Sequence, residues 1–191
     1  KYPEFVPWCL DAKIYNKNDK DDKIEITADL RIGKSFFNET YKSFVIYDKF
    51  LEKASPLFGG KTGTTWDMSC GYGGRLLGAI AADVNYIGTD PCTETYEGLE
   101  QIKEDWGSKN KTIELHKVGS EDFWPPYCEV DLCFTSPPYY DWEKYSDEDT
   151  QSYIKYPTRE EWLNGFLLET IDKCHYGLKP GGILALNVAN T

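Results

Sequence analysis

A stiff loop bearing hydrogen-bond acceptors follows a predicted apolar strand, residues 129–135. The loop reads Ser136-Pro137-Pro138-Tyr139. Neither proline can donate a ladder hydrogen bond, and each favours extended geometry in the residue before it, so the strand must end at Ser136. The loop carbonyls can accept hydrogen bonds from a ligand, and Tyr139 offers a flat face for stacking. These groups suit a planar ring with an amino substituent, and an ordinary rigid turn is the alternative.

A glycine-rich turn joins a short strand, residues 64–68, to an apolar helix, residues 73–83. Gly71 and Gly73 lie in this turn. Glycines let the backbone approach a ligand, and the amides at a helix start face it. Leu76 stands where a dinucleotide fingerprint has its third glycine, and no phosphate-cradling G-K-[ST] follows. The turn therefore suits an adenosine ligand without phosphates.

Carboxylates follow the predicted strands at the same edge of the sheet. Asp67 precedes the glycine turn, and Asp90 ends strand 85–89. Their separation is close to the roughly 20 positions at which an acidic side chain binds a ribose diol. Alternatives stay open for each candidate: Asp67 can cap its own turn, Asp90 can be a solvated strand end, and Asp122 can cap a helix.

This ordered set of motifs resembles the S-adenosylmethionine-dependent amino-methyltransferases of DNA, in particular phage and prokaryotic members. The resemblance covers about residues 64–190 and is carried by Asp67-x-x-x-Gly71-x-Gly73-Gly74-Arg75-Leu76-Leu77-Gly78-Ala79, by Tyr86-Ile87-Gly88-Thr89-Asp90-Pro91, by Ser136-Pro137-Pro138-Tyr139 and by Leu178-Lys179-Pro180-Gly181-Gly182. It implies an α/β fold of the Rossmann-like class I methyltransferase type, with a mostly parallel sheet and helices on both faces. It also implies methyl transfer to an exocyclic amino nitrogen of a DNA base, as in restriction-modification.

The resemblance also assigns site residues. The cofactor-binding set is Asp67, Ser69, Cys70, Gly71, Gly73, Asp90, Pro91 and Asp122, and the catalytic set is Ser136, Pro137, Pro138 and Tyr139. The turn amides would face the methionine part of the cofactor, Asp90 the ribose hydroxyls and Asp122 the adenine amine. Ser136, where other members carry aspartate, favours cytosine N4 over adenine N6. No metal is required.

The net charge of −11 argues against binding of duplex DNA, because proteins that bind duplex DNA usually have a basic surface. Carboxylates dominate the segment after the proline loop: Asp141, Glu143, Asp147, Glu148, Asp149, Glu160 and Glu161. Either a basic recognition element lies elsewhere, or lysines form a local patch, or the substrate is not duplex DNA. DNA is the expected partner, and RNA or protein glutamine substrates are alternatives. An inactive cofactor-binding subunit of an assembly is a further one.

The length of 191 residues predicts one core. Gly59-Gly60 and the turn that follows mark a boundary between an aromatic and helical segment over 1–62 and the catalytic domain over 63–191, which the resemblance implies binds S-adenosylmethionine. No apolar stretch is long enough to span a membrane, and no leader is recognisable. The six cysteines include no C-x-x-C pair, so reduced thiols in the cytoplasm are expected. His116 and His175 are expected to be structural. The chain begins without methionine and stops just past an apolar strand, so we expect it to be trimmed at its C-terminus.

Strands and helices are predicted to alternate along the chain. The predicted strands are 24–32, 64–68, 85–89, 111–118, 129–135 and 182–188; the predicted helices are 41–54, 73–83, 92–106 and 158–177; a charged loop is predicted over 16–22.

Overall fold

The computed structural model describes residues 14–16, 19–24, 63–140 and 142–187. Its elements in chain order are β1 (Ile14–Asn16), β2 (Asp19–Ile24), β3 (Thr64–Asp67), α2 (Gly74–Ala81), β4 (Asn85–Thr89), α3 (Thr93–Trp106), β5 (Ile113–His116), the 3₁₀ turn η1 (Ser120–Asp122), β6 (Val130–Thr135), α4 (Ser152–Lys155), α5 (Arg159–Trp162), the π-helical segment η2 (Leu163–Leu168), α6 (Glu169–Gly177) and β7 (Leu178–Leu186).

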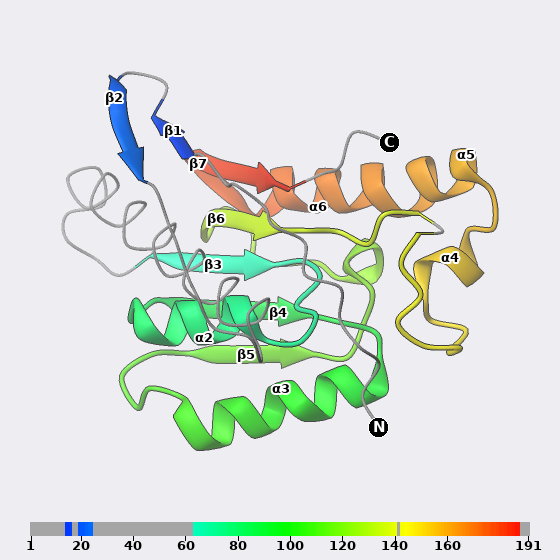
Figure 1. Cartoon of the computed structure of the whole chain (residues 1–191), viewed down its shortest axis with the longest axis horizontal. Helices are drawn as coiled ribbons and strands as arrows, with labels where there is room; N and C mark the ends of the chain where they lie inside the picture. Colours follow the sequence, from blue (N-terminus) through cyan, green and yellow to red (C-terminus); the bar gives the residue numbers. More distant parts are fainter. Residues whose placement is uncertain (1–13, 17–18, 25–62, 141, 188–191) are drawn as a thin grey trace.

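Five of these strands form one parallel sheet in the order β5-β4-β3-β6-β7 (Figure 1). The chain builds outward from β3 through β4 to β5, and then crosses to the other side of β3 to begin β6. The strand order therefore reverses between β3 and β6. In open α/β sheets, ligands bind beyond the carboxyl ends of the strands at such a switch point.

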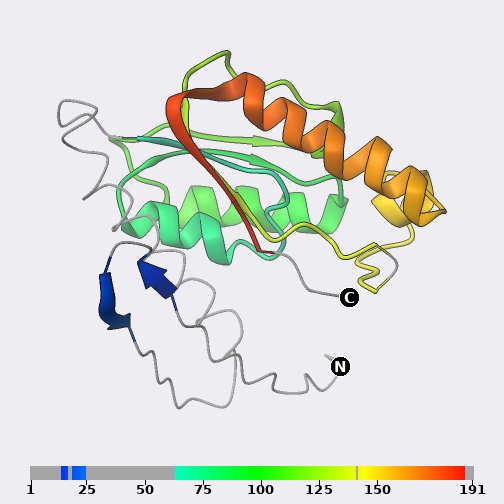
Figure 2. The same ribbon diagram turned by 90° about the horizontal axis from the view of Figure 1, so that it is seen from above.

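Helices cover both faces of the sheet, with α2 and α3 on one side and α6 on the other (Figure 2). Successive residues of each strand point to opposite faces of the sheet. On one face, Tyr86 and Leu132 pack with Leu76 of α2 and Leu99 of α3. Their neighbours Ile87 and Cys133 pack with Trp66, Met68 and Cys174 on the α6 face. Burial on both faces explains why apolar residues occupy successive positions in these strands.

The predicted alternation of strands and helices is confirmed from residue 64 onward, with small shifts at the ends. Predicted helix 158–177 is observed as the continuous run of α5, η2 and α6. The last strand begins earlier than predicted, at Leu178, and β5 is shorter than predicted strand 111–118. Two short elements, η1 and α4, lie where the sequence indicated only loop.

The charged loop predicted over residues 16–22 is wrong for its second half, because β2 begins at Asp19. β1 and β2 pair antiparallel, and this pairing satisfies the backbone irrespective of side-chain charge. Helix 41–54 and almost all of strand 24–32 lie outside the described residues, as does most of the segment 1–62. Within the described part of the chain, no helix is long and apolar enough to cross a membrane.

Candidate functional site

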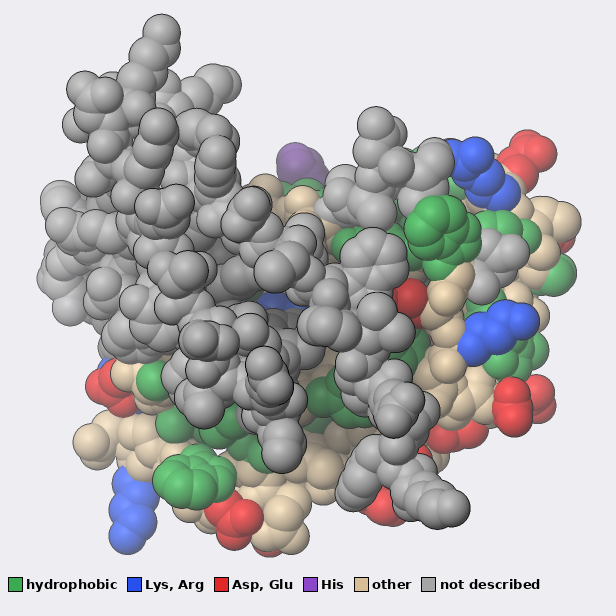
Figure 3. Space-filling model, in the orientation of Figure 1, with side chains coloured by type: hydrophobic (Ala, Val, Ile, Leu, Met, Phe, Trp, Pro, Cys, Tyr) green, Lys and Arg blue, Asp and Glu red, His purple; other side chains and the backbone are tan. Residues whose placement is uncertain are grey.

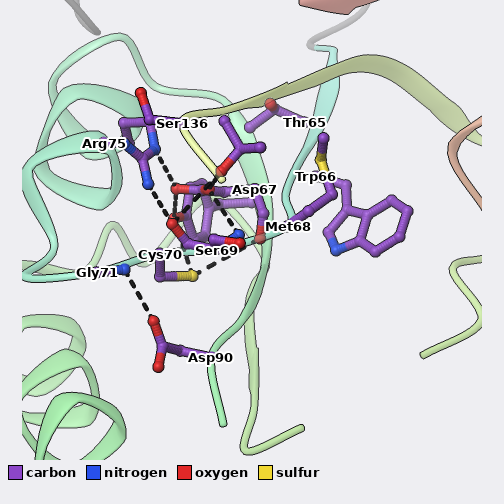
Figure 4. Close-up of polar contacts among 12 residues, drawn as sticks. Thr65, Trp66, Asp67, Met68, Ser69, Cys70, Gly71, Arg75, Asp90 and Ser136 are labelled. Carbon is purple, nitrogen blue, oxygen red and sulfur yellow. Dashed lines mark hydrogen bonds and ion pairs between the residues drawn. The ribbon is translucent and has the colours of Figure 1, made fainter. Parts of the chain in front are cut away.

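The carboxyl ends of β3, β4 and β6 bring most of the predicted site residues to one edge of the sheet. Asp67 is the last residue of β3, Asp90 follows β4, and Ser136 follows β6. Figure 4 shows the glycine turn between the first two carboxylates, with Ser136 near the turn. The switch point therefore carries three of the predicted motifs.

Asp67 is completely buried and is held by four donors of the chain itself. Its Oδ2 accepts from Arg75 Nε at 2.8 Å and from the Tyr86 hydroxyl at 2.7 Å. Its Oδ1 accepts from the Thr135 hydroxyl at 2.9 Å and from the Ser69 amide at 3.3 Å. The bond to the Ser69 amide agrees with the alternative in which Asp67 caps its own turn.

Asp90 lies beside the turn, and both of its carboxylate oxygens accept from backbone amides. Oδ2 accepts from Gly71 at 2.9 Å and Oδ1 from Cys92 at 3.0 Å. Burial raises the pKa of Asp90 to about 6, although the two amide bonds lower it; nearby Asp67 adds to the rise and Arg75 opposes it. A buried carboxylate that titrates near neutrality at a switch point is a candidate ligand-binding group.

The two glycines of the turn differ in their surroundings, although both have left-handed backbone conformations. A Cβ on Gly71, whose φ is 55°, would meet no atom of the described residues within 4 Å. A Cβ on Gly73, whose φ is 84°, would lie 2.6 Å from Ile102 Cδ1 of α3. Gly71 thus borders open space that a ligand can enter, whereas Gly73 lets α3 pack closely against the turn.

Ser69, Cys70 and Pro91 complete the predicted cofactor set. The Ser69 carbonyl accepts from Arg75 Nη2, and its side chain is half-buried. Cys70 is buried with its amide on the Thr89 carbonyl, and burial, followed by the charge of Asp67, raises the pKa of its thiol. This agrees with a cysteine that packs rather than reacts. Pro91 is half-buried directly after Asp90.

The proline loop is fixed at its two ends by Asn187, the residue after β7. Asn187 Nδ2 donates to Ser136 Oγ at 2.9 Å, and the Tyr139 hydroxyl donates to the Asn187 carbonyl at 3.3 Å. Pro137 is buried, and Pro138 and Tyr139 are half-buried. Burial, followed by the Glu143 carboxylate, raises the pKa of Tyr139, so its hydroxyl stays protonated at neutral pH. The loop is therefore a preformed element.

Asp122 lies in η1, after β5, and its side chain is 59% exposed. Lys155 Nζ of α4 lies 2.6 Å from Asp122 Oδ2 and 2.6 Å from Oε1 of the buried Glu121. The structure thus places Asp122 at the same edge of the sheet, in an ion pair.

The segment between the proline loop and α5 contacts all three turns of this edge. The ring of Tyr145 lies 6.3 Å from that of Tyr72 in the glycine turn. Glu148 accepts from the amide and hydroxyl of Thr93, at 2.9 and 2.8 Å, and so occupies the N-terminus of α3. Lys155 binds η1, as described above. The proline loop, the glycine turn and η1 thus belong to one connected structure.

Several residues of this site escaped the sequence analysis: Arg75, Tyr86, Thr135, Glu148, Lys155 and Asn187. Arg75 did carry a signal, because an arginine within an apolar helical run needs a buried partner, and Asp67 is the nearest carboxylate that precedes it in the sequence. Asn187 and Tyr86 carried none, since their contacts join distant positions.

Solved structures with this arrangement of strands and helices are similar to the chain. A Haemophilus influenzae protein described as the methylase HI0767 matches with a TM-score of 0.51 and 13% identity, over 76% of this chain and 73% of that chain. The fold is that of a Rossmann-like methyltransferase. A Methanococcus maripaludis protein described as an S-adenosyl-L-methionine-dependent methyltransferase has a TM-score of 0.49 and 15% identity, over 85% of this chain and 67% of that one. The YcgJ protein of Bacillus has a TM-score of 0.49 and 16% identity over 76% of this chain. The matched region is 50% of the YcgJ chain.

Sequence comparisons do not define a family for this Rossmann-like methyltransferase fold. No protein-family model matches the chain. The mitochondrial coenzyme Q-binding protein COQ10 of Dictyostelium discoideum is 36% identical over 75 residues, which are 37% of this chain and 35% of that protein. That match covers only about a third of either protein, so it shows no family membership.

Proposed function

We propose that this protein transfers a methyl group from S-adenosylmethionine to an exocyclic amino nitrogen of a DNA base, with cytosine N4 favoured over adenine N6. One observation carries the proposal: the Gly71 turn with Asp90 and the Ser136 to Tyr139 loop lie at adjacent strand ends of a methyltransferase fold. A cofactor site and an acceptor site are thus neighbours at the switch point.

The residues present fit S-adenosylmethionine, which supplies an electrophilic methyl group on a sulfonium. Asp90 would accept hydrogen bonds from the ribose hydroxyls, and its negative charge suits a cationic ligand. Open space beside Gly71 would admit the cofactor against the backbone. Asp122 would reach the adenine amine from η1, next to its partner Lys155.

The proline loop supplies the groups that an aromatic amine requires. The lone pair of such an amine is delocalised into its ring, so the nitrogen must become pyramidal before it attacks the methyl group. Ser136 Oγ and the Pro137 carbonyl would accept hydrogen bonds from its two N–H groups and favour that geometry as charge develops. Tyr139 would stack on the extruded base. In-line alignment would then contribute much of the rate.

The acidic composition of the segment after the loop weighs less against DNA than the sequence alone indicates. Glu143 accepts from the Tyr139 amide, Glu148 caps α3, and Glu161 forms a capping box with Thr158. These carboxylates have internal partners, and Figure 3 shows basic and acidic side chains interspersed on the side that carries α4 and α5. Net charge affects association more than chemistry.

A labelled-methyl assay tests this function. The whole protein is incubated at low salt with S-adenosylmethionine labelled in its methyl group and with separate pools of DNA, RNA and protein. Label in the DNA pool supports the proposal. Label only in RNA or in protein moves the acceptor to one of the alternatives, and cofactor binding without transfer to any pool indicates an inactive subunit.

A further inference from the structure

The buried carboxylate of Asp67 joins the two halves of the site. Its hydrogen-bond partners come from four separate segments: Ser69 from the glycine turn, Arg75 from α2, Tyr86 from β4 and Thr135 from β6. Figure 4 shows Ser69 and Arg75 beside the carboxylate. Asp67 ends β3, which lies between β4 and β6 in the sheet. Asp67 therefore contacts the elements on both sides of the switch point.

Thr135 connects this carboxylate to the acceptor loop. It is fully buried, it is the last residue of β6, and it directly precedes Ser136. Its hydroxyl donates to Asp67 Oδ1 at 2.9 Å, and its carbonyl accepts from the Asn187 amide, also at 2.9 Å. Thr135 thus sets the position of Ser136, and the Thr135 side chain is itself bonded to Asp67, which holds the glycine turn.

Arg75 fixes the opposite side of the same carboxylate. Its side chain is only 4% exposed, and besides its bond to Asp67 it donates to the Ser69 carbonyl. A buried guanidinium with a rigid fork of donors holds both the carboxylate and the turn backbone in one arrangement. With both oxygens of Asp67 occupied by partners of the chain, little capacity is left for a ligand.

We infer that Asp67 is a positioning residue, not a cofactor ligand. Through Thr135 it sets the distance between the glycine turn and the proline loop, and hence between methyl donor and acceptor amine. This inference rests on the proposed function for its catalytic consequence, while the coupling of the two loops is a property of the fold alone. Reactions of this kind lose rate steeply when the reacting groups are misplaced by about 1 Å.

The chain offers a matched pair of threonines for the test. Thr65 Oγ1 of β3 donates to the Leu132 carbonyl of β6 at 3.1 Å, so Thr65 is also a buried threonine that links these two strands. Thr135→Val removes the bond to Asp67 and, with it, the longer contact of the same hydroxyl with the Ser69 carbonyl at 3.4 Å. Thr65→Val removes a bond unrelated to the loops, and Thr135→Ser keeps the hydroxyl.

The measurements are kcat, KM for the cofactor, cofactor Kd, and amide hydrogen exchange in residues 69–74 and 139–143. For Thr135→Val we expect kcat to fall by about 10-fold or more with Kd changed less than about 2-fold. Exchange should rise in both segments of the unliganded protein. Thr135→Ser should keep kcat and hydrogen exchange near the parental values. Thr65→Val should change neither kcat nor hydrogen exchange in these two segments. Equal behaviour of the two valine variants overturns the inference.

Hydrogen exchange separates this inference from the proposed function. If the parent protein transfers no methyl group to any acceptor, the proposed function fails, yet faster exchange in both loops of Thr135→Val alone still supports the coupling. If exchange in the loops is the same in the two valine variants, the coupling fails even for an active enzyme.

Discussion

The backbone amide of Gly71 donates a 2.9 Å hydrogen bond to Oδ2 of Asp90, which joins the glycine turn after β3 to the end of β4. Two sequence motifs that are nineteen positions apart are thereby in direct contact. A ligand that enters beside Gly71 therefore meets the Asp90 carboxylate. Both this contact and the proline loop can be tested by substitution.

Cofactor affinity should depend on pH through Asp90. Its pKa of about 6 means that the carboxylate is charged above pH 7 and protonated below pH 5. Since the charged form accepts the ribose hydrogen bonds, affinity should be constant above pH 7 and fall as the pH drops through 6. Calorimetry of S-adenosylmethionine binding from pH 5 to 8 measures this.

Asp90→Asn is the control for that titration. It should weaken binding at pH 7.5 by about 1.5 to 3 kcal/mol, because a charge-assisted bond is lost. It should also flatten the profile between pH 5 and 7. An identical pH profile in both proteins would show that Asp90 is only a buried strand end, and that another group titrates.

Gly71→Ala and Gly73→Ala should fail in different ways. At Gly71 the methyl group enters open space, so the folded protein pays only the cost of a positive φ, about 1 kcal/mol, while the ligand space is reduced. At Gly73 the methyl group also collides with Ile102 of α3, so stability should fall further. Thermal melting and cofactor binding are measured for each variant. If Gly71→Ala bound the cofactor with the affinity of the parent, the cofactor would not occupy the space beside Gly71.

Asp67→Asn should destabilise the fold strongly. Asparagine keeps only one acceptor oxygen, so its NH2 group must face two of the four donors that bind the carboxylate. The buried guanidinium of Arg75 also loses its counter-charge, at a cost of about 3 to 5 kcal/mol. Denaturant unfolding gives the difference. Asp122→Asn at the exposed pair with Lys155 is the matched control and should cost less than about 1 kcal/mol. Similar losses in both variants would contradict the special role of Asp67.

Tyr139→Ala and Ser136→Ala should separate acceptor binding from cofactor binding. Removal of the Tyr139 ring should reduce transfer to nucleic acid by at least about 10-fold, since one lost base stack is worth about 1 to 3 kcal/mol. Removal of the Ser136 hydroxyl deletes an acceptor aimed at the amine. Cofactor affinity, measured by calorimetry, should stay near that of the parent. Transfer at the parental rate in both variants would make the loop a structural turn.

The sequence predicted the fold from residue 64 onward because doubly buried strands and amphipathic helices alternate there with clear turn signals. It also placed Asp90, Gly71 and Ser136 at one edge, since parallel strands bring their carboxyl ends together. It did not reveal the partners of Asp67. Tyr86 and Thr135 look like ordinary strand residues until β3, β4 and β6 are aligned, and only then do their hydroxyls meet the carboxylate.

The partners of the carboxylates after the proline loop were likewise hidden in the sequence. Glu148 reads as one more solvated charge in sequence, but in the structure it lies at the N-terminus of α3, fifty-five positions away from its partner Thr93. The hydrogen bonds that Glu148 accepts from the amide and then the hydroxyl of Thr93 lower its pKa, as expected for a carboxylate at a helix start. Composition gives the charge of a segment, and only the fold decides which charges face solvent.

We propose that this protein methylates an exocyclic amine of a DNA base. The most direct measurement is mass spectrometry of nucleosides from DNA that the whole protein has treated with S-adenosylmethionine carrying a deuterated methyl group. We predict deuterated N4-methylcytosine in excess over N6-methyladenine, and neither product with Tyr139→Ala above about a tenth of the parental yield. Deuterium absent from every DNA base, in a protein that calorimetry shows to bind the cofactor, would contradict the account.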